Sequence, residues 1–126
     1  MKKHILVAED SADLAELYCV QLESLGFDVT VAKNGREAMK LAPLLRPDLI
    51  IMDILMPKMD GLEATRQIRE NPATRDIPIL AATAKALDGD KEKCLAAGCD
   101  DYIAKPFTHR ELGAAIEAVL KHPTKL

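Results

Sequence analysis

The chain has 126 residues, of which 48% are hydrophobic and 29% are charged, and its formal net charge at pH 7 is −3. This length favours a single domain over residues 1–126, which buries about two-thirds of the surface of the unfolded chain. With two tyrosines, two phenylalanines and no tryptophan, the mildly acidic chain lacks the basic patches and aromatic platforms typical of nucleic-acid binding, so no nucleic-acid partner is expected.

The apolar runs of the sequence are far shorter than a membrane-spanning helix, and the N-terminus has no signal-peptide core or cleavage site. We therefore expect a cytoplasmic protein without membrane association. The three cysteines, Cys19, Cys94 and Cys99, are an odd number that argues against a disulfide framework. Cys94 and Cys99 could supply two zinc ligands, but no second Cys/His pair has suitable spacing, so reduced structural thiols are expected.

Five apolar runs alternate with segments of helical period along the whole chain. The predicted strands are residues 4–8, 27–32, 48–52, 77–82 and 101–104. The first, third and fourth runs are continuously apolar, as in parallel strands buried on both faces. The second run alternates apolar and polar residues, which predicts a half-exposed edge strand.

The segments between these runs show the spacing and the termini of helices. Gly26 and Gly98 stand where a C-cap glycine would lead into the next strand, and Thr108 with Glu111 forms the pattern of a capping box. Helical spacing is clearest for Ala38, Met39, Ala42 and Leu45, and for Leu112, Ala115, Ile116 and Val119. The sequence predicts an α/β fold, a (βα)5 flavodoxin-like, doubly wound parallel sheet of order 2-1-3-4-5 with helices on both faces.

Acidic residues follow the first and third apolar runs, whose strands flank the switch point of this topology. Glu9 and Asp10 follow the first run and Asp53 follows the third. The carboxyl ends of parallel strands share one edge, so the three carboxylates should converge, and each pair at about 5 Å repels by about 3 kcal/mol at an effective dielectric constant near 20. A hard divalent cation would compensate this repulsion, and Mg²⁺ suits this number of oxygen ligands, with Mn²⁺ as an alternative ion.

A hydroxyl and an ammonium group occupy the same edge in the last two strands. Thr83 closes the fourth apolar run and Lys105 follows the fifth. An Asp53 carboxylate that attacks phosphorus would form an aspartyl-phosphate, and Thr83 and Lys105 are suited to hold its oxygens. Taken singly, these residues read as a helix-start acid, a loop acid, a strand threonine or a solvated lysine, but their joint placement favours a site. His4 lies at the other end of its strand, and His109 and His122 read as surface residues.

Four segments closely resemble the receiver domain of two-component response regulators, of the kind found in chemotaxis regulators. They are Ile5–Asp10, Asp53–Gly61, Ala82–Ala84 and Lys105–Phe107, and the resemblance extends over essentially the whole chain. It implies a regulator that accepts phosphate at Asp53 from a partner's phosphohistidine and catalyses its own phosphorylation and dephosphorylation, without being an enzyme that acts on other substrates.

The resemblance also implies a role for each matching residue. Asp10, Asp53 and the backbone carbonyl of Leu55 would bind Mg²⁺ directly, and Glu9 would act mainly through metal-bound water. Thr83 and Lys105 would contact the phosphoryl oxygens, and the Lys105–Pro106 bond is expected to be cis.

Tyr102 matches the switch aromatic of the family. Movement of Thr83 toward the phosphoryl group would let Tyr102 turn inward and alter the face formed by helix 4, strand 5 and helix 5. The alternative is a partly exposed strand aromatic without a switching role.

Two further positions bear on the lifetime of the phosphoryl group. Leu55 and Lys85 offer no amide or carboxylate to orient an attacking water, so slow autodephosphorylation is expected.

The expected partners are a sensor histidine kinase or histidine phosphotransfer protein and a downstream protein target, with a monomer or a phosphorylation-dependent dimer. A haloacid-dehalogenase-type phosphatase is disfavoured because Leu55 stands where its second acid would be, and a pseudo-receiver because the acids, threonine and lysine are all present. The start at Met1 and the short polar tail 122–126 favour a stand-alone protein, the alternative being a receiver module of a hybrid kinase or longer regulator.

Overall fold

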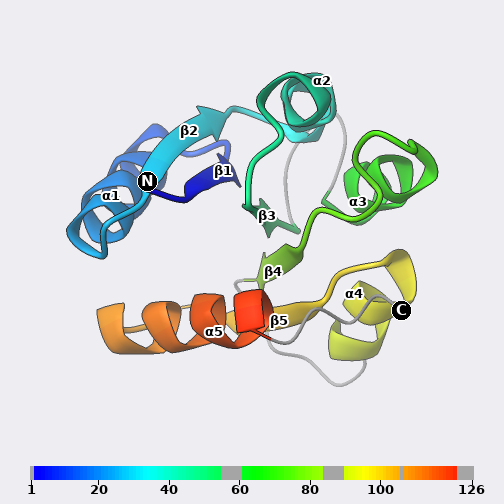
Figure 1. Cartoon of the computed structure of the whole chain (residues 1–126). Coiled ribbons are helices and arrows are strands. Elements are labelled where there is room, and N and C mark those ends of the chain that lie inside the picture. Colours follow the sequence, from blue (N-terminus) through cyan, green and yellow to red (C-terminus); the bar gives the residue numbers. More distant parts are fainter. Residues whose placement is uncertain (1, 55–60, 84–89, 106, 122–126) are drawn as a thin grey trace.

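A computed structural model describes residues 2–54, 61–83, 90–105 and 107–121. Within these residues, five strands alternate with five helices along the chain (Figure 1). The strands are β1 (His4–Ala8), β2 (Asp28–Ala32), β3 (Leu49–Asp53), β4 (Ile79–Thr83) and β5 (Asp101–Ala104). The helices are α1 (Ala12–Ser24), α2 (Gly35–Leu45), α3 (Gly61–Glu70), α4 (Asp90–Ala97) and α5 (His109–Lys121).

The strands form one parallel sheet of order β2-β1-β3-β4-β5, which confirms the predicted topology. β2 lies at one edge and is largely half-buried, as its alternating sequence predicted. β3 and β4 each extend one residue further than predicted, to Asp53 and Thr83. β4 begins only at Ile79, because the Ile79 amide donates to the Asp100 carboxylate (2.8 Å) and the Ile77 amide donates to the Thr74 carbonyl (3.1 Å).

Two layers of helices cover the sheet and enclose two hydrophobic cores (Figure 1). α1 and α5 cover one face, where Leu22 and Ile116 pack against alternate strand residues such as Val7 and Ile51. α2, α3 and α4 cover the other face, where Ile68 packs against the intervening strand residues. Strand side chains alternate between faces, so strand parity assigns each site residue to one of the two layers.

The helix termini follow the predicted capping. Thr108 and Glu111 exchange hydrogen bonds (2.8 and 3.0 Å) and so form the predicted capping box. Gly26 and Gly98 have φ values of 96° and 116°, which is the left-handed region expected of a C-cap glycine. No helix among the described residues is long and apolar enough to cross a membrane.

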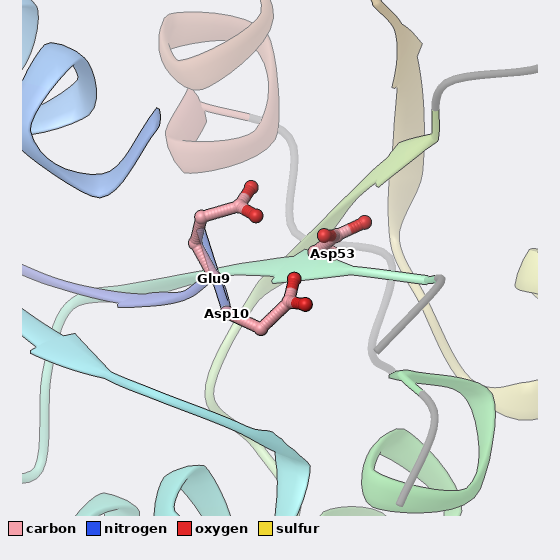
Figure 2. A group of neighbouring side chains, drawn as sticks. All are labelled: Glu9, Asp10 and Asp53. Atoms are coloured by element: carbon pink, nitrogen blue, oxygen red, sulfur yellow. The ribbon is translucent and has the colours of Figure 1, made fainter. Parts of the chain in front are cut away.

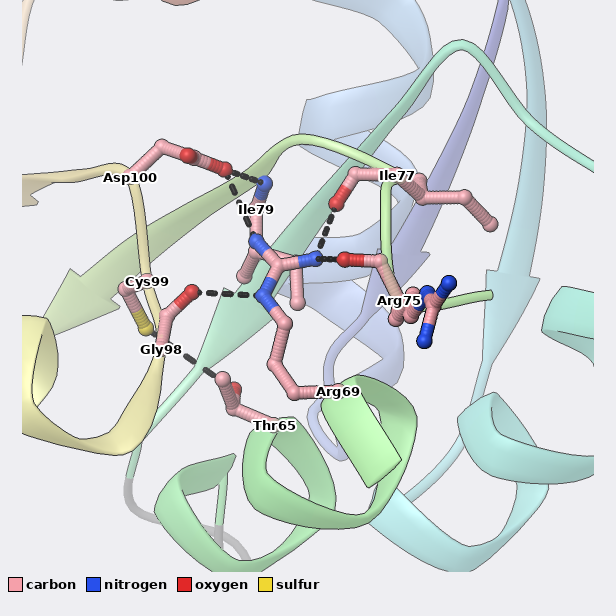
Figure 3. Close-up of polar contacts among 8 residues, drawn as sticks. All are labelled: Thr65, Arg69, Arg75, Ile77, Ile79, Gly98, Cys99 and Asp100. Atoms are coloured by element: carbon pink, nitrogen blue, oxygen red, sulfur yellow. Dashed lines mark hydrogen bonds and ion pairs between the residues drawn. The ribbon is translucent and has the colours of Figure 1, made fainter. Parts of the chain in front are cut away.

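An arginine at the end of α3 ties together the amino-terminal edge of the sheet (Figure 3). The Arg69 guanidinium donates to the Gly98 carbonyl (2.8 Å) and pairs with the Asp100 carboxylate (2.9 Å). It also donates to the carbonyls of Arg75 (2.8 Å) and Ile77 (2.6 Å). A single guanidinium thus joins α3, the segment before β4 and the turn before β5.

The three cysteines are reduced thiols that form no disulfide, as predicted. Cys94 and Cys99 are buried in the core under α3 and α4, and the Cys99 thiol lies 3.8 Å from the Thr65 hydroxyl (Figure 3). Burial raises the pKa of the Cys99 thiol to about 12, so the thiol stays protonated at neutral pH. These cysteines are therefore packing residues of the core.

Candidate metal and phosphoryl-transfer site

The three acids singled out from the sequence meet at the carboxyl edge of the sheet. Glu9 and Asp10 follow β1, and Asp53 ends the adjacent strand β3 (Figure 2). One carboxylate oxygen from each of the three lies within 4.8 Å of those of the other two. Glu9 and Asp53 are buried whereas Asp10 is exposed, so the group opens to solvent on the Asp10 side.

The sheet itself fixes the backbone beneath these carboxylates. The Glu9 amide donates to the Ala32 carbonyl of β2 (3.0 Å), and Asp53 pairs with Ala82 of β4. The Ile54 amide donates to the Ala82 carbonyl (3.0 Å) and continues the ladder past Asp53. Glu9 and Asp53 therefore project from hydrogen-bonded backbone, which holds them close despite their mutual repulsion.

Lys105 joins the acid group from β5, on the far side of β4. Its ammonium lies 3.0 Å from Glu9 Oε1 and 3.7 Å from Asp53 Oδ2. The side chains are 17% exposed for Lys105, 1% for Glu9 and 8% for Asp53, so water screens these contacts only weakly. The sequence placed Lys105 at this edge but did not predict that Glu9 would be its nearer partner.

Thr83 and Tyr102 lie on the neighbouring strands β4 and β5, Thr83 at the carboxyl end of β4 and Tyr102 within β5. Thr83 is the last residue of β4 and is buried, and its carbonyl accepts the Lys105 amide (2.7 Å). Tyr102 in β5 pairs with Ala81 and is partly buried against the core under α3 and α4. Thr83 thus ends the strand that pairs with β3, and the roles of Thr83 and Tyr102 are proposals.

A glycine lets α3 approach the end of β3 closely. Gly61 begins α3, and its amide donates to the Ile54 carbonyl (3.0 Å). A Cβ at Gly61 would overlap the carbonyl of Asp53, so any side chain at this position would displace either the helix or the strand end. Gly61 therefore contributes to the position of Asp53, although the sequence marked it only as part of a motif.

The donor set fits a hard divalent cation. Three carboxylates supply oxygen ligands at separations that one ion can bridge, and the exposed side leaves room for water ligands, which Mg²⁺ retains in proteins. Lys105 neutralises one of the three charges, so the group keeps a net negative charge that attracts a cation. Leu55, Lys85 and the Lys105–Pro106 bond lie outside the described residues.

His4 lies away from the acid group, whereas the charges of two of the acids act on Tyr18. The His4 ring lies at the opposite end of β1, where its Nε2 is 2.7 Å from the Thr30 hydroxyl. The sequence did not mark Tyr18 of α1 as a residue near the site. In the structure, burial and then the charges of Glu9 and Asp53 raise the pKa of its hydroxyl. The sequence feature that could have identified Tyr18 is a hydroxyl at a core-facing position of the helix that follows Glu9 and Asp10. Phenylalanine would fill that position equally well if only packing mattered.

Comparisons with known proteins agree with this geometry. A family model, the response regulator receiver domain, matches residues 5–117. The alkaline phosphatase synthesis transcriptional regulatory protein PhoP of Bacillus subtilis is 42% identical over 96% of this chain and 50% of its own length. The polar-differentiation response regulator DivK of Brucella anthropi is 39% identical over 86% of this chain and 88% of its own length. The chain spans about half the length of several transcriptional regulators that it matches, PhoP among them.

Solved structures show the same fold with a related site. The receiver domain of a sensor histidine kinase from Pseudomonas aeruginosa is 40% identical, with a TM-score of 0.89 over 96% of this chain and 99% of that one. That structure has a magnesium ion coordinated in its active site cleft. The fold, the sequence match and the cluster of acids lead to the same conclusion: this chain belongs to the response regulator receiver domains, the phosphoacceptor signalling modules of two-component phosphorelays.

Proposed function

We propose that Asp53 is the phosphoacceptor of this receiver domain. The observation that carries the proposal is the position of its carboxylate at the end of β3, within 4.8 Å of the acids that follow β1 and 3.7 Å from the Lys105 ammonium. A carboxylate oxygen of Asp53 would attack the phosphorus of a phosphohistidine and form a new oxygen–phosphorus bond. The nitrogen–phosphorus bond breaks, and the leaving imidazole takes up a proton.

A divalent cation completes this site, and Glu9, Asp10, Asp53 and the backbone carbonyl of Leu55 would hold Mg²⁺, or Mn²⁺ in its place. The ion supplies positive charge that neutralises phosphoryl oxygens as they approach the carboxylates. Asp10 is exposed at the open side and is suited to ligate directly, whereas the buried Glu9 lies against Lys105 and would act mainly through water.

Lys105 and Thr83 would bind the transferred phosphoryl group. Lys105 already lies 3.7 Å from Asp53 Oδ2, so its ammonium reaches a group attached there with a small movement of a flexible side chain. Thr83 ends the strand next to β3 and offers a hydroxyl donor. With these groups and the cation, the chain would catalyse its own phosphorylation and dephosphorylation.

Signalling would follow from a shift between two conformations. Movement of Thr83 toward the phosphoryl group would let Tyr102 turn inward, which changes the face formed by α4, β5 and α5. The phosphoryl group drives this change only as far as it binds one conformation better than the other. The donors would be a sensor histidine kinase or histidine phosphotransfer protein, and the changed face would bind a downstream protein or a second copy of the chain.

The aspartyl-phosphate would be long-lived among receivers. This proposal rests on the sequence at Leu55 and Lys85, which offers no group that orients an attacking water. A phosphoryl half-life of only seconds at neutral pH would contradict it.

The test of the proposed function is intact-mass spectrometry after incubation with acetyl phosphate. The wild-type chain should gain one phosphoryl group in Mg²⁺ and none in EDTA, and Asp53→Asn should gain none. Asp28→Asn is the matched control, because it removes an exposed carboxylate at the opposite edge of the sheet and should leave the adduct unchanged. An adduct that persists in Asp53→Asn would assign the phosphoacceptor elsewhere. If no adduct forms on the wild type, a phosphohistidine donor separates a strict need for kinase from a chain that is not phosphorylated.

A further inference from the structure

Tyr18 has a buried hydroxyl without a hydrogen-bond partner. The residue lies on the inner face of α1 and is 4% exposed. Among the buried side-chain nitrogen and oxygen atoms of the described residues, only the Tyr18 hydroxyl oxygen has no hydrogen-bond partner. Buried polar groups are almost always paired because leaving one unpaired is costly, so this hydroxyl calls for an explanation.

The hydroxyl belongs to the layer that contains Glu9, Asp53 and Lys105. Tyr18 packs in the core under α1 and α5 with Val7 and Ile51, which lie two residues before Glu9 and Asp53 on the same strand faces. Its ring also contacts Phe107, two residues after Lys105, at a centroid distance of 5.8 Å. Side chains of a helix lean toward its N-terminus, and the N-terminus of α1 is the end next to the acid group.

The Tyr18 hydroxyl keeps its proton and so always remains a hydrogen-bond donor. Burial, and then the charges of Glu9 and Asp53, raise the pKa of the hydroxyl well above its usual range. The phenol therefore keeps its proton and can donate it to a nearby carboxylate without ionising.

The negative charge of the buried Glu9 carboxylate is compensated by Lys105. Its Oε1 lies 3.0 Å from the Lys105 ammonium, and its Oε2 accepts the Ser11 amide (3.2 Å). A phosphoryl group on Asp53 would bring additional negative charge to within reach of the same ammonium. As Lys105 turns toward that group, the buried Glu9 carboxylate would lose its only strong donor in the described part of the chain.

We propose that the Tyr18 hydroxyl then donates a hydrogen bond to the Glu9 carboxylate and thereby stabilises the phosphorylated state. The inference rests on the proposed phosphorylation of Asp53. Tyr18 is a positioning residue: it would not touch the phosphoryl group but would release Lys105 from Glu9 to bind it. A hydroxyl that is unpaired before phosphorylation and paired after it shifts the balance toward the phosphorylated state.

A purely structural role makes a different prediction. If Tyr18 only fills the core, its ring carries the effect, and loss of the hydroxyl changes both states equally. If the hydroxyl pairs only after phosphorylation, its removal relieves an unpaired polar group in one state and deletes a hydrogen bond in the other. Tyr18→Phe keeps the ring and separates these cases.

The experiment measures binding of beryllofluoride, a mimic of a phosphoryl group bound to a carboxylate, by isothermal titration calorimetry in Mg²⁺. Wild type should bind and Asp53→Asn should not. Tyr18→Phe should bind about tenfold more weakly, as expected for loss of one hydrogen bond to a charged group. Its melting temperature without beryllofluoride should be unchanged or higher. Thr30→Val is the matched control: it removes a half-buried hydroxyl that contacts His4 at the far edge, and it should leave the affinity for beryllofluoride unchanged.

A second readout reports the hydrogen bond directly. In protein with ¹³Cζ-labelled tyrosine, the resonance that is lost in Tyr18→Phe should shift when beryllofluoride binds to wild type. An affinity within twofold of wild type, or an unmoved Tyr18 resonance, would overturn the inference while leaving phosphorylation of Asp53 intact. Failure of wild type itself to bind beryllofluoride would instead refute the proposed function, and this inference with it.

Discussion

Substitution of Asp10 should stabilise the metal-free protein more than substitution of either neighbouring acid. The three carboxylates repel one another, but only two of them have a cation close by. Lys105 lies 3.0 Å from Glu9 and 3.7 Å from Asp53. No Lys, Arg or His side chain within the described ranges lies within 4.0 Å of the Asp10 carboxylate. The amide substitutions therefore differ in the attraction that each one removes.

The distances give the sizes of these interactions. At an effective dielectric constant near 20, carboxylate oxygens no more than 4.8 Å apart repel by at least about 3.5 kcal/mol. On the same basis, the ammonium attracts Glu9 at 3.0 Å by about 5.5 kcal/mol and Asp53 at 3.7 Å by about 4.5 kcal/mol. Each substitution relieves two repulsions, but only Asp10→Asn loses no such attraction. Because Asp10 is exposed and screened, the measurable gain is about 1 kcal/mol.

The assay is thermal unfolding of Asp10→Asn, Asp53→Asn and Glu9→Gln in EDTA, followed by circular dichroism. The melting temperatures should fall in that order, with Asp10→Asn above wild type. Mg²⁺ should then raise the melting temperature of wild type more than that of any variant, because ligand binding stabilises the folded state by about 2.7 kcal/mol at a hundred times the dissociation constant. The order of wild type and Asp10→Asn should therefore reverse on adding metal.

Two controls separate charge repulsion from other effects. In 1 M salt, where the screening length is about 3 Å, the advantage of Asp10→Asn in EDTA should shrink. Asp28→Asn, at the opposite edge of the sheet, should change the melting temperature little in either condition. A melting temperature of Asp10→Asn below that of wild type in EDTA would refute the claim that these carboxylates repel in the folded protein.

Three further predictions concern residues around the site and in the core. Gly61→Ala should slow phosphorylation by acetyl phosphate at least tenfold, measured by intact mass, because a Cβ there overlaps the carbonyl of Asp53, the proposed phosphoacceptor; unchanged kinetics would contradict this close approach. Arg69→Lys should lower the free energy of unfolding in urea by about 2–3 kcal/mol, because an ammonium cannot make the four contacts of the guanidinium, and a loss below 0.5 kcal/mol would count against the clamp. Iodoacetamide at pH 8 should label Cys19 slowly and spare Cys94 and Cys99 until the chain unfolds, since both are buried from the reagent and burial raises the pKa of the Cys99 thiol; peptide mapping that finds Cys99 labelled in folded protein would contradict this.

The topology was predictable because each strand carries its own burial signal. The continuous apolar runs of β1, β3 and β4 indicated strands covered on both faces, and the alternation in β2 indicated an edge. These local signals, with right-handed crossovers, leave few possible orders for the sheet. The convergence of Glu9, Asp10 and Asp53 followed from the same reasoning, since it depends only on which strands end beside each other.

Features that depend on distances between remote side chains were not predictable. The start of β4 at Ile79 is set by Asp100, 21 residues away, which accepts the Ile79 amide and pairs with Arg69. Nothing in the sequence near Ile79 indicates that partner. The Glu9–Lys105 pair, 96 residues apart, is of the same kind, because several acids at that edge were equally plausible partners for the lysine.

Because Lys105 lies closest to Glu9, the three acids differ in how much of their negative charge is compensated. Glu9 is buried beside the ammonium, so its charge is largely compensated and it contributes least to the attraction for a cation. Asp10 is exposed and lacks such a partner in the described residues, so it dominates the field on the side from which an ion approaches. The Asp53 carboxylate is 3.7 Å from the Lys105 ammonium and within 4.8 Å of the carboxylate oxygens of both other acids. A phosphoryl group on Asp53 would then contact positive charge on two sides: a divalent cation bound near Asp10, and the Lys105 ammonium, which pairs with Glu9 before phosphorylation.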